Sequence, residues 1–361
     1  MGTLRTIILF FIIFGVVVIS HEMGHFLLAK AGGIHVVEFA VGMGPTLLSF
    51  QRGDTKYSLK LFPIGGACMF EGEDGLNAKE GEDNSGAFPN ANVWKRISTV
   101  LAGPMFNFIL GFFIALALVN LIMSGEDGGI RIPVATQVVE GGAAAEAGMQ
   151  DGDRILSLNG EKVYLYQELV LFNAVYHYQG GEVKVVYDRN GQQGTAYVTP
   201  HYDEEYGRYM FGFINQDFAR PKGLETLKYA WYHVRFYMNY TYKSLKLLIS
   251  GLVGRKDVSG PVGIANMVGE TYEAARKYGW KDVVESMLDI TLLLTVNLGI
   301  LNLLPIPALD GGRLVFLAIE VVRGKPVPPD KEGLVHFIGL MFFMILMVFI
   351  FFNDIANVLG L

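Results

Sequence analysis

The sequence predicts a polytopic α-helical membrane protein with about four transmembrane helices, a membrane-associated β-hairpin region and an inserted, extracytoplasmic β-rich domain. Of its 361 residues, 51% are hydrophobic and 18% are charged, whereas soluble proteins have roughly 25% charged residues. Four apolar segments are long enough to cross a bilayer core of about 30 Å. A net charge of −6 without a basic stripe argues against a nucleic-acid partner. The single cysteine excludes a disulfide framework and a multi-cysteine metal site.

The apolar segments cover residues 3–28, 97–123, about 286–320 with breaks, and 334–352. The first lies close to the N-terminus, where a signal peptide would place its apolar core. Val18 and the bulky Ile19 stand where a cleavable signal peptide has small residues. We therefore expect this segment to remain as an uncleaved first span.

Short-loop charges predict the orientation in the membrane, because cytoplasmic loops are enriched in lysine and arginine. The loop between the third and fourth segments carries Arg323, Lys325 and Lys331. This pattern predicts that residues 31–96 and 322–333 lie in the cytoplasm. Both termini and the long region 124–283 then lie outside.

Glycine and proline divide residues 36–70 into short apolar runs, such as Thr46–Phe50 and Tyr57–Phe62. Such runs are typical of short strands joined by turns. Residues 71–92 are acidic and polar, which indicates a solvated loop.

Residues 129–200 have the composition of a small soluble domain with several strands and two helices. Asn159-Gly160 is a strong hairpin turn, and Leu165–Tyr176 has helical periodicity. The stretch AxxAGMxxGDRILSLNG within Val134–Val163 resembles a bacterial PDZ domain. The resemblance implies a groove that accepts an extended peptide. We assign residues 127–201 to this domain.

Residues 202–283 form a connecting region that is rich in aromatic residues between Tyr202 and Tyr242. Basic residues are interleaved with the aromatic ones. Two interpretations stay open. The region forms an amphipathic helix on the membrane surface, or a helix that packs within the outer domain.

The end of the first span contains the motif His21-Glu22-Met23-Gly24-His25. Histidines four residues apart on a helix lie about 40° apart, so both can bind one zinc ion. Glu22 follows on the helix and could take a proton from a water molecule. Ionisable groups at this depth cost roughly 2.5–3.5 kcal/mol each, which favours a bound metal. The alternative is a polar cluster at the aqueous end of the helix.

A site with two histidines needs a third protein ligand, and Asp310 is the candidate. Pro305 and Pro307 interrupt the third segment just before it, which a membrane helix tolerates only where protein or water satisfies the backbone. Gly311 and Gly312 let the backbone come close to the site. Since Asp-Gly-Gly is also a common turn, this motif alone leaves both interpretations open. The remaining histidines have no partner at ligand spacing.

Together, HExxH in the first span, the PDZ-like insert and NxxPxPxLDGG in the third span resemble the site-2 protease family. The likeness is to bacterial RseP-type intramembrane proteases in their single-PDZ form. It implies that His21, His25 and Asp310 bind one zinc ion per chain, that Glu22 is the catalytic base, and that Asn302 binds substrate. Gly103-Pro104-Met-Phe-Asn107 and Gly260-Pro261-Val262-Gly263 also resemble family motifs.

The resemblance further implies a multi-pass protein of a bacterial cell membrane, with its active site towards the cytoplasm. Catalytic parts at residues 1–123 and 284–361 would cleave single-span membrane proteins, such as anti-sigma factors or remnant signal peptides, after a first cut outside. The alternative is a non-catalytic scaffold with a structural metal, although such a site needs no Glu22. A metal transporter is disfavoured, because spans two and four offer only Asn107 and Asn120 in their cores.

Overall fold

The computed structural model describes residues 2–73, 86–125, 128–179, 181–252, 254 and 259–359. The chain divides into two compact units. Unit 1 comprises Met1–Ile114 and Gly254–Leu361, and unit 2 comprises Ala115–Val253. Most of the acidic loop expected at 71–92 lies outside the described residues.

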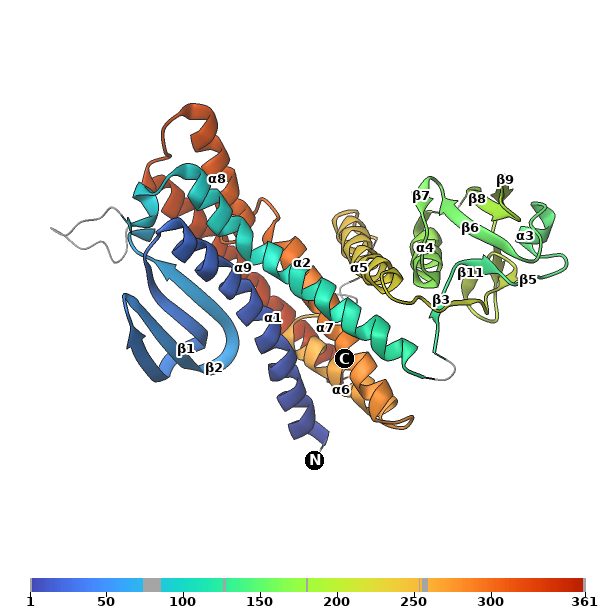
Figure 1. The fold of residues 1–361 in the computed structure, drawn as a ribbon, viewed down its shortest axis with the longest axis horizontal. Coiled ribbons are helices and arrows are strands. Elements are labelled where there is room, and N and C mark those ends of the chain that lie inside the picture. The colour runs from blue at the N-terminus through green and yellow to red at the C-terminus, as the bar shows by residue number, and fades with distance from the viewer. Residues whose placement is uncertain are drawn as a thin grey trace. The chain divides into compact units, whose positions relative to one another are not determined.

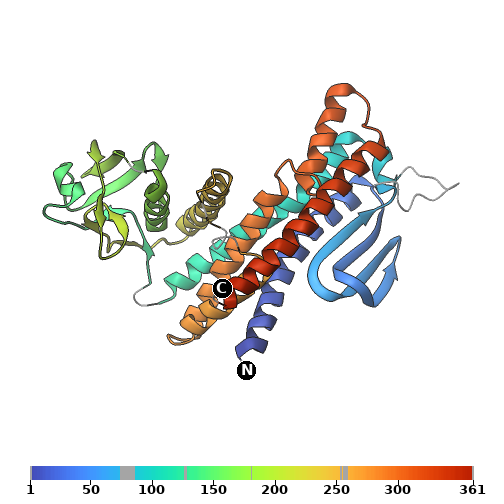
Figure 2. The same ribbon diagram turned by 180° about the vertical axis from the view of Figure 1, so that it is seen from behind.

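Four helices are long and apolar enough to cross a membrane, as expected. They are α1 (Gly2–Gly32), α2 (Val93–Met123), α7 (Trp280–Asn302) and α9 (Pro329–Leu359). In unit 1 they run side by side, and both views show α9 along this bundle (Figures 1 and 2). Their outward faces expose leucine, isoleucine and phenylalanine, which suits a lipid environment.

The third apolar segment is a membrane helix followed by a separate shorter helix. α7 ends at Asn302, and α8 (Asp310–Arg323) begins after a turn at 303–309. Pro305 and Pro307 cannot donate the backbone hydrogen bonds of a continuing helix, which explains the break. An additional helix, α6 (Pro261–Ala275), lies within the region expected only to connect.

The buried Asp354 of α9 holds the start of α6. The backbone N–H groups of Gly260 and Gly263 donate to its carboxylate at 3.0 and 2.8 Å. This contact satisfies donors that a helix N-terminus leaves unpaired. It gives the Gly260–Gly263 motif a structural role that the sequence did not reveal.

Residues 36–70 form one hairpin, as expected, but its two strands are long, so the expectation of short strands was wrong. β1 (Val36–Arg52) pairs antiparallel with β2 (Thr55–Phe70). The glycines do not end the strands. Gly42 and Gly44 have φ of 89° and 88° and lie among register shifts that bend the ladder. β2 packs against α1, beside the segment that carries HExxH (Figure 1).

Unit 2 has a five-stranded sheet in the order β4-β6-β8-β9, with β7 on β6. Its strands are β4 (Val134–Ala135), β6 (Asp153–Leu158), β7 (Glu161–Lys162), β8 (Val183–Arg189) and β9 (Gln192–Val198). Its helices are α3 (Ala143–Glu146), α4 (Tyr166–Gln179) and α5 (Glu225–Ile249). The expected hairpin turn is present, with φ of 50° at Asn159 and 85° at Gly160.

Short strands continue this unit past residue 201, the boundary expected from the sequence. Their bounds are β3 (Ile130–Arg131), β5 (Gln137–Val138), β10 (His201–Asp203), β11 (Arg208–Met210), β12 (Phe213–Ile214) and β13 (Phe218–Ala219). β12 pairs with β5 and β13 pairs with β3, while β10 and β11 form a hairpin. The β-rich domain therefore includes residues that the sequence assigned to a connecting region.

α5 packs within unit 2 through one face. That face buries Ala230, His233, Val234, Tyr237 and Thr241. Arg235 forms an ion pair with Glu168 of α4, and Lys243 lies 2.6 Å from Glu161. Of the two interpretations of this region, the buried face of α5 therefore supports a helix that packs within the outer domain.

Candidate metal centre

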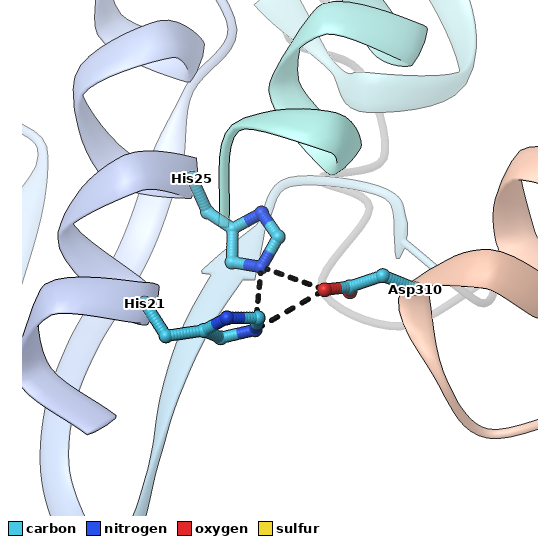
Figure 3. A group of neighbouring side chains, drawn as sticks. All are labelled: His21, His25 and Asp310. Atoms are coloured by element: carbon cyan, nitrogen blue, oxygen red, sulfur yellow. Dashed lines mark hydrogen bonds and ion pairs between the residues drawn. The ribbon is translucent and has the colours of Figure 1, made fainter. Parts of the chain in front are cut away.

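Three side chains from distant parts of the chain meet at one point (Figure 3). α1 presents His21 and His25 one turn apart, with their Nε2 atoms 3.2 Å from each other. Asp310, the first residue of α8, places Oδ2 at 3.1 Å from His21 Nε2 and 3.3 Å from His25 Nε2. Among the described residues, no other group of histidine, cysteine and acidic side chains converges in this way.

The triangle of atoms fits a zinc ion. Zinc binds nitrogen and carboxylate oxygen at about 2.0–2.2 Å, so tetrahedral ligands lie about 3.3 Å from one another. The observed separations of 3.1, 3.2 and 3.3 Å are close to that value. Two imidazoles and one carboxylate leave the fourth position open, as in catalytic zinc sites.

α2 orients both imidazoles. His25 Nδ1 donates to the backbone oxygen of Thr99 at 2.9 Å, and the Asn107 amide lies 3.2 Å from His21 Nδ1. A zinc-bound His21 needs Nδ1 to donate. A 180° turn of the amide would offer Asn107 Oδ1, a buried atom without a partner among the described residues, as the acceptor. Both contacts direct Nε2 towards Asp310, the usual role of residues behind metal ligands.

Glycines allow α2 to lie directly against this face of α1. A Cβ atom on Gly103 would be 2.2 Å from His25 Nε2 and 2.9 Å from His21 Cε1. A Cβ on Gly24 would be 2.3 Å from the backbone oxygen of Ala102. Gly103 and Asn107 were noted in the sequence without a defined role, and the structure places both beside the histidines.

Glu22 and Asn302 border the same cavity, which has a volume of about 580 Å³. Cys68 of β2 lines this cavity together with Glu22. Asn302, the last residue of α7, has its amide nitrogen 3.4 Å from His21 Nε2. The structure thus brings together all five side chains selected from the sequence.

One end of this cavity is bounded by an ion pair between Glu73 and Arg313. Glu73 also accepts a hydrogen bond of 3.1 Å from the backbone N–H of Phe70, at the end of β2. The pair therefore connects the hairpin to α8. Sequence reasoning missed it, since only the fold brings an acidic residue of the loop to the arginine after Asp-Gly-Gly.

Gly311 and Gly312 serve a different contact from the one expected. A Cβ on Gly311 would be 2.1 Å from the Leu304 backbone oxygen, and one on Gly312 would be 2.4 Å from that of Ile306. The two glycines let the first turn of α8 pack on the turn before it. They position Asp310 indirectly, without approaching the histidines themselves.

The other histidines differ from one another. His35 and His201 pair with Glu71 at 2.7 Å and Glu146 at 3.1 Å. Burial lowers the pKa of His233 to about 4. His336 accepts a hydrogen bond from the backbone N–H of Ala308 at 3.0 Å, a contact that the sequence did not indicate.

The fold and the site define a membrane-embedded metalloprotease. Residues 9–346 match peptidase family M50, so the chain belongs to this family of zinc-dependent proteases, which includes the site-2 proteases. It is therefore an enzyme, its cofactor is zinc, and it is a multi-pass bacterial membrane protein with protease activity. These points confirm the family, the activity and the cofactor predicted from the sequence.

Individual relatives match over nearly their whole length. The chain is 33% identical to zinc metalloprotease RasP of Bacillus licheniformis, over 98% of this chain and 99% of the relative. It is 32% identical to the regulator of sigma-W protease RasP of Bacillus subtilis, again over 98% and 99%. A putative zinc metalloprotease of Clostridium acetobutylicum is 33% identical over 97% of both chains.

Proposed function

We propose that this enzyme binds one zinc ion through His21, His25 and Asp310, and that Glu22 is its catalytic base. The observation that carries this proposal is the triangle of ligand atoms, with sides of 3.1 to 3.3 Å, on a cavity that Glu22 also borders. Bound zinc would polarise the scissile carbonyl and lower the pKa of a water molecule. Glu22 takes a proton from that water and delivers it to the leaving amine.

The substrate must be extended at the point of cleavage, because a helix shields its own peptide bonds. β2 residues 65–70 line the cavity and offer a strand beside which an unwound segment can lie. Asn302, 3.4 Å from His21, is placed to hold the substrate backbone with its amide. These two features are the proposed substrate-binding elements.

We infer that the substrates are single-span membrane proteins already cut outside the cell, such as anti-sigma factors or remnant signal peptides. A relative named as a regulator of sigma-W protease supports this class. In this proposal residues 127–201, with the strands up to Ala219 that pair with them, form a PDZ domain that recognises the trimmed end. Residues 1–123 and 284–361 form the catalytic parts.

The proposed orientation places both termini and the PDZ domain outside, with the active site towards the cytoplasm. Arg323, Lys325 and Lys331, in and beside the loop between α8 and α9, are exposed and support it. The hairpin would lie in the membrane, since its distal part exposes Leu47, Leu48, Phe50, Leu61 and Phe62. In a Cys68→Ala background, a membrane-impermeant maleimide should label Gln193→Cys but not Lys325→Cys in intact cells. Labelling of Lys325→Cys but not of Gln193→Cys would show that the topology is the reverse of the proposed one.

Cleavage of a purified single-span substrate tests the catalytic assignment. Glu22→Gln should lower the rate about 10²- to 10⁴-fold while zinc content stays at one per chain. Glu140→Gln, at an exposed position of unit 2, is the matched control and should cleave normally. Equal cleavage by Glu22→Gln and wild type would remove Glu22 as the base. Zinc binding without cleavage of several substrates by the wild type would favour the alternative, a non-catalytic scaffold.

A further inference from the structure

Most of the apolar stretch of α9 is not buried against the rest of unit 1. Of residues 331–352, all of which the structure describes, only His336 and Gly339 are buried. They lie three residues apart and therefore on the same face of the helix. The remaining side chains of this stretch, mostly leucine, phenylalanine and methionine, are exposed or half-buried. A polar ring at one of the two buried positions of residues 331–352 requires a specific partner.

That partner is the turn that leads into the metal centre. The backbone N–H of Ala308 donates to His336 Nδ1 at 3.0 Å. Next to it, a Cβ on Gly339 would be 2.5 Å from Pro307 Cβ and 2.8 Å from the Pro307 carbonyl. Gly339 thus lets α9 lie directly on the turn, which brings the imidazole within reach of Ala308.

Ala308 adopts a conformation that its side chain disfavours. Its φ is 73°, one of three positive values outside glycine among the described residues, and the other two belong to asparagines. Alanine rarely enters this left-handed region unless surrounding contacts hold it there. Two residues later the chain starts α8 with Asp310, after an extended Leu309 with φ −102° and ψ 163°. The conformation at Ala308 therefore sets where the Asp310 carboxylate lies.

We propose that His336 is a positioning residue for the metal centre. Its neutral ring, with the proton on Nε2, holds Ala308 in the left-handed conformation and so aims Asp310 at the two histidines. The Phe316 ring of α8, whose centroid is 5.5 Å from that of His336, packs beside the imidazole. This inference rests on the proposed role of Asp310 as a zinc ligand. It assigns the fourth span a part in the chemistry although that span provides no ligand.

The test measures zinc affinity of the full chain in detergent by competition with a chromogenic chelator. His336→Leu removes the acceptor and should weaken zinc binding about 10- to 100-fold, as removal of residues behind metal ligands does. His336→Asn keeps an acceptor near the place of Nδ1 and should stay within a few-fold of the wild type. His201→Leu, at an exposed position of unit 2, is the matched control and should not change affinity.

A second variant separates positioning from simple packing. Ala308→Gly should bind zinc like the wild type, because glycine adopts positive φ without support. Combined with His336→Leu, it should restore most of the lost affinity and the cleavage rate. If His336→Leu acted only by removing packing, Ala308→Gly would not restore the zinc affinity.

The outcomes distinguish the two proposals. Unchanged affinity in His336→Leu, or no recovery in the double variant, would overturn the role of His336. If His336→Leu does not fold, His336→Asn decides instead. A loss of zinc affinity in His336→Asn as large as that in Asp310→Ala would overturn the role of His336. If Asp310→Ala binds zinc as tightly as the wild type, the proposed ligand set fails instead.

Discussion

Replacing Gly103 with alanine tests how tightly α2 constrains the metal centre. The new Cβ would lie 2.2 Å from His25 Nε2, the atom that faces Asp310. Ordinary carbon contacts are about 3.5–4.0 Å, so the imidazole or the helix must retreat by more than about 1 Å. Zinc–ligand distances tolerate deviations of about 0.2 Å. The substitution should therefore remove His25 from the proposed ligand set.

The loss of zinc affinity should be large, since zinc binding is worth roughly 10–16 kcal/mol in zinc-finger peptides and one of the three proposed protein ligands is displaced. We expect zinc affinity to fall at least about 100-fold, measured by chelator competition, with a parallel loss of cleavage. Gly15→Ala is the matched control on the helix that carries both histidines, because no atom lies within 4 Å of the new Cβ. Wild-type zinc affinity in Gly103→Ala would refute the packing argument.

Three further predictions concern residues outside the ligand set. Asn107→Leu removes the amide that lies 3.2 Å from His21 Nδ1, so it should weaken zinc binding about 10- to 100-fold. Unchanged zinc affinity in this variant would contradict the prediction. Asp153→Ala should lower the unfolding free energy of unit 2, since the fully buried carboxylate bonds the partly exposed Arg189 at 2.7 Å through two atoms. Hydrogen exchange in unit 2 measures the change, with Glu140→Ala as control. Burial lowers the pKa of His233 from 6.5 to about 4. As the pH falls, the unfolded chain therefore binds a proton at His233 before the folded chain does. Stability should be constant above about pH 6.5 and fall by about 2 kcal/mol at pH 5, measured by exchange of α5 amides. His233→Leu should flatten that dependence, and an equal fall in this variant would assign the effect elsewhere.

The three side chains that meet in the structure could be selected from the sequence, because spacing along a helix or the chemistry of the segment singles each of them out. HExxH fixes its two histidines on one helix face through spacing alone. Asp310 could be selected because an ionisable residue after Pro305 and Pro307 in an apolar segment needs a reason to be there. The four spans were predictable for a similar reason, since apolar length is a property of the sequence itself.

The residues behind the ligands could not be found in this way. Thr99 acts through its backbone oxygen, and any residue at that position offers the same atom. Gly103 matters because of a clash that exists only once α1 and α2 have packed. His336 contacts the turn before Asp310 through a backbone N–H, which leaves no pattern in the sequence. The hairpin was predicted, but its strands were expected to be short because glycines were interpreted as strand ends, whereas here they bend a continuous ladder.

The distance along the chain between the halves of the metal centre has a consequence for biosynthesis. Asn302 and His21 are 281 residues apart, and Asp310 is synthesised later still. At roughly 5–20 residues per second on the ribosome, the first span enters the membrane tens of seconds before the carboxylate exists. With the ligand set proposed above, a nascent or truncated chain has the histidines and the base but an incomplete zinc site. With that ligand set, proteolysis would have to wait until the chain has been synthesised past Asp310.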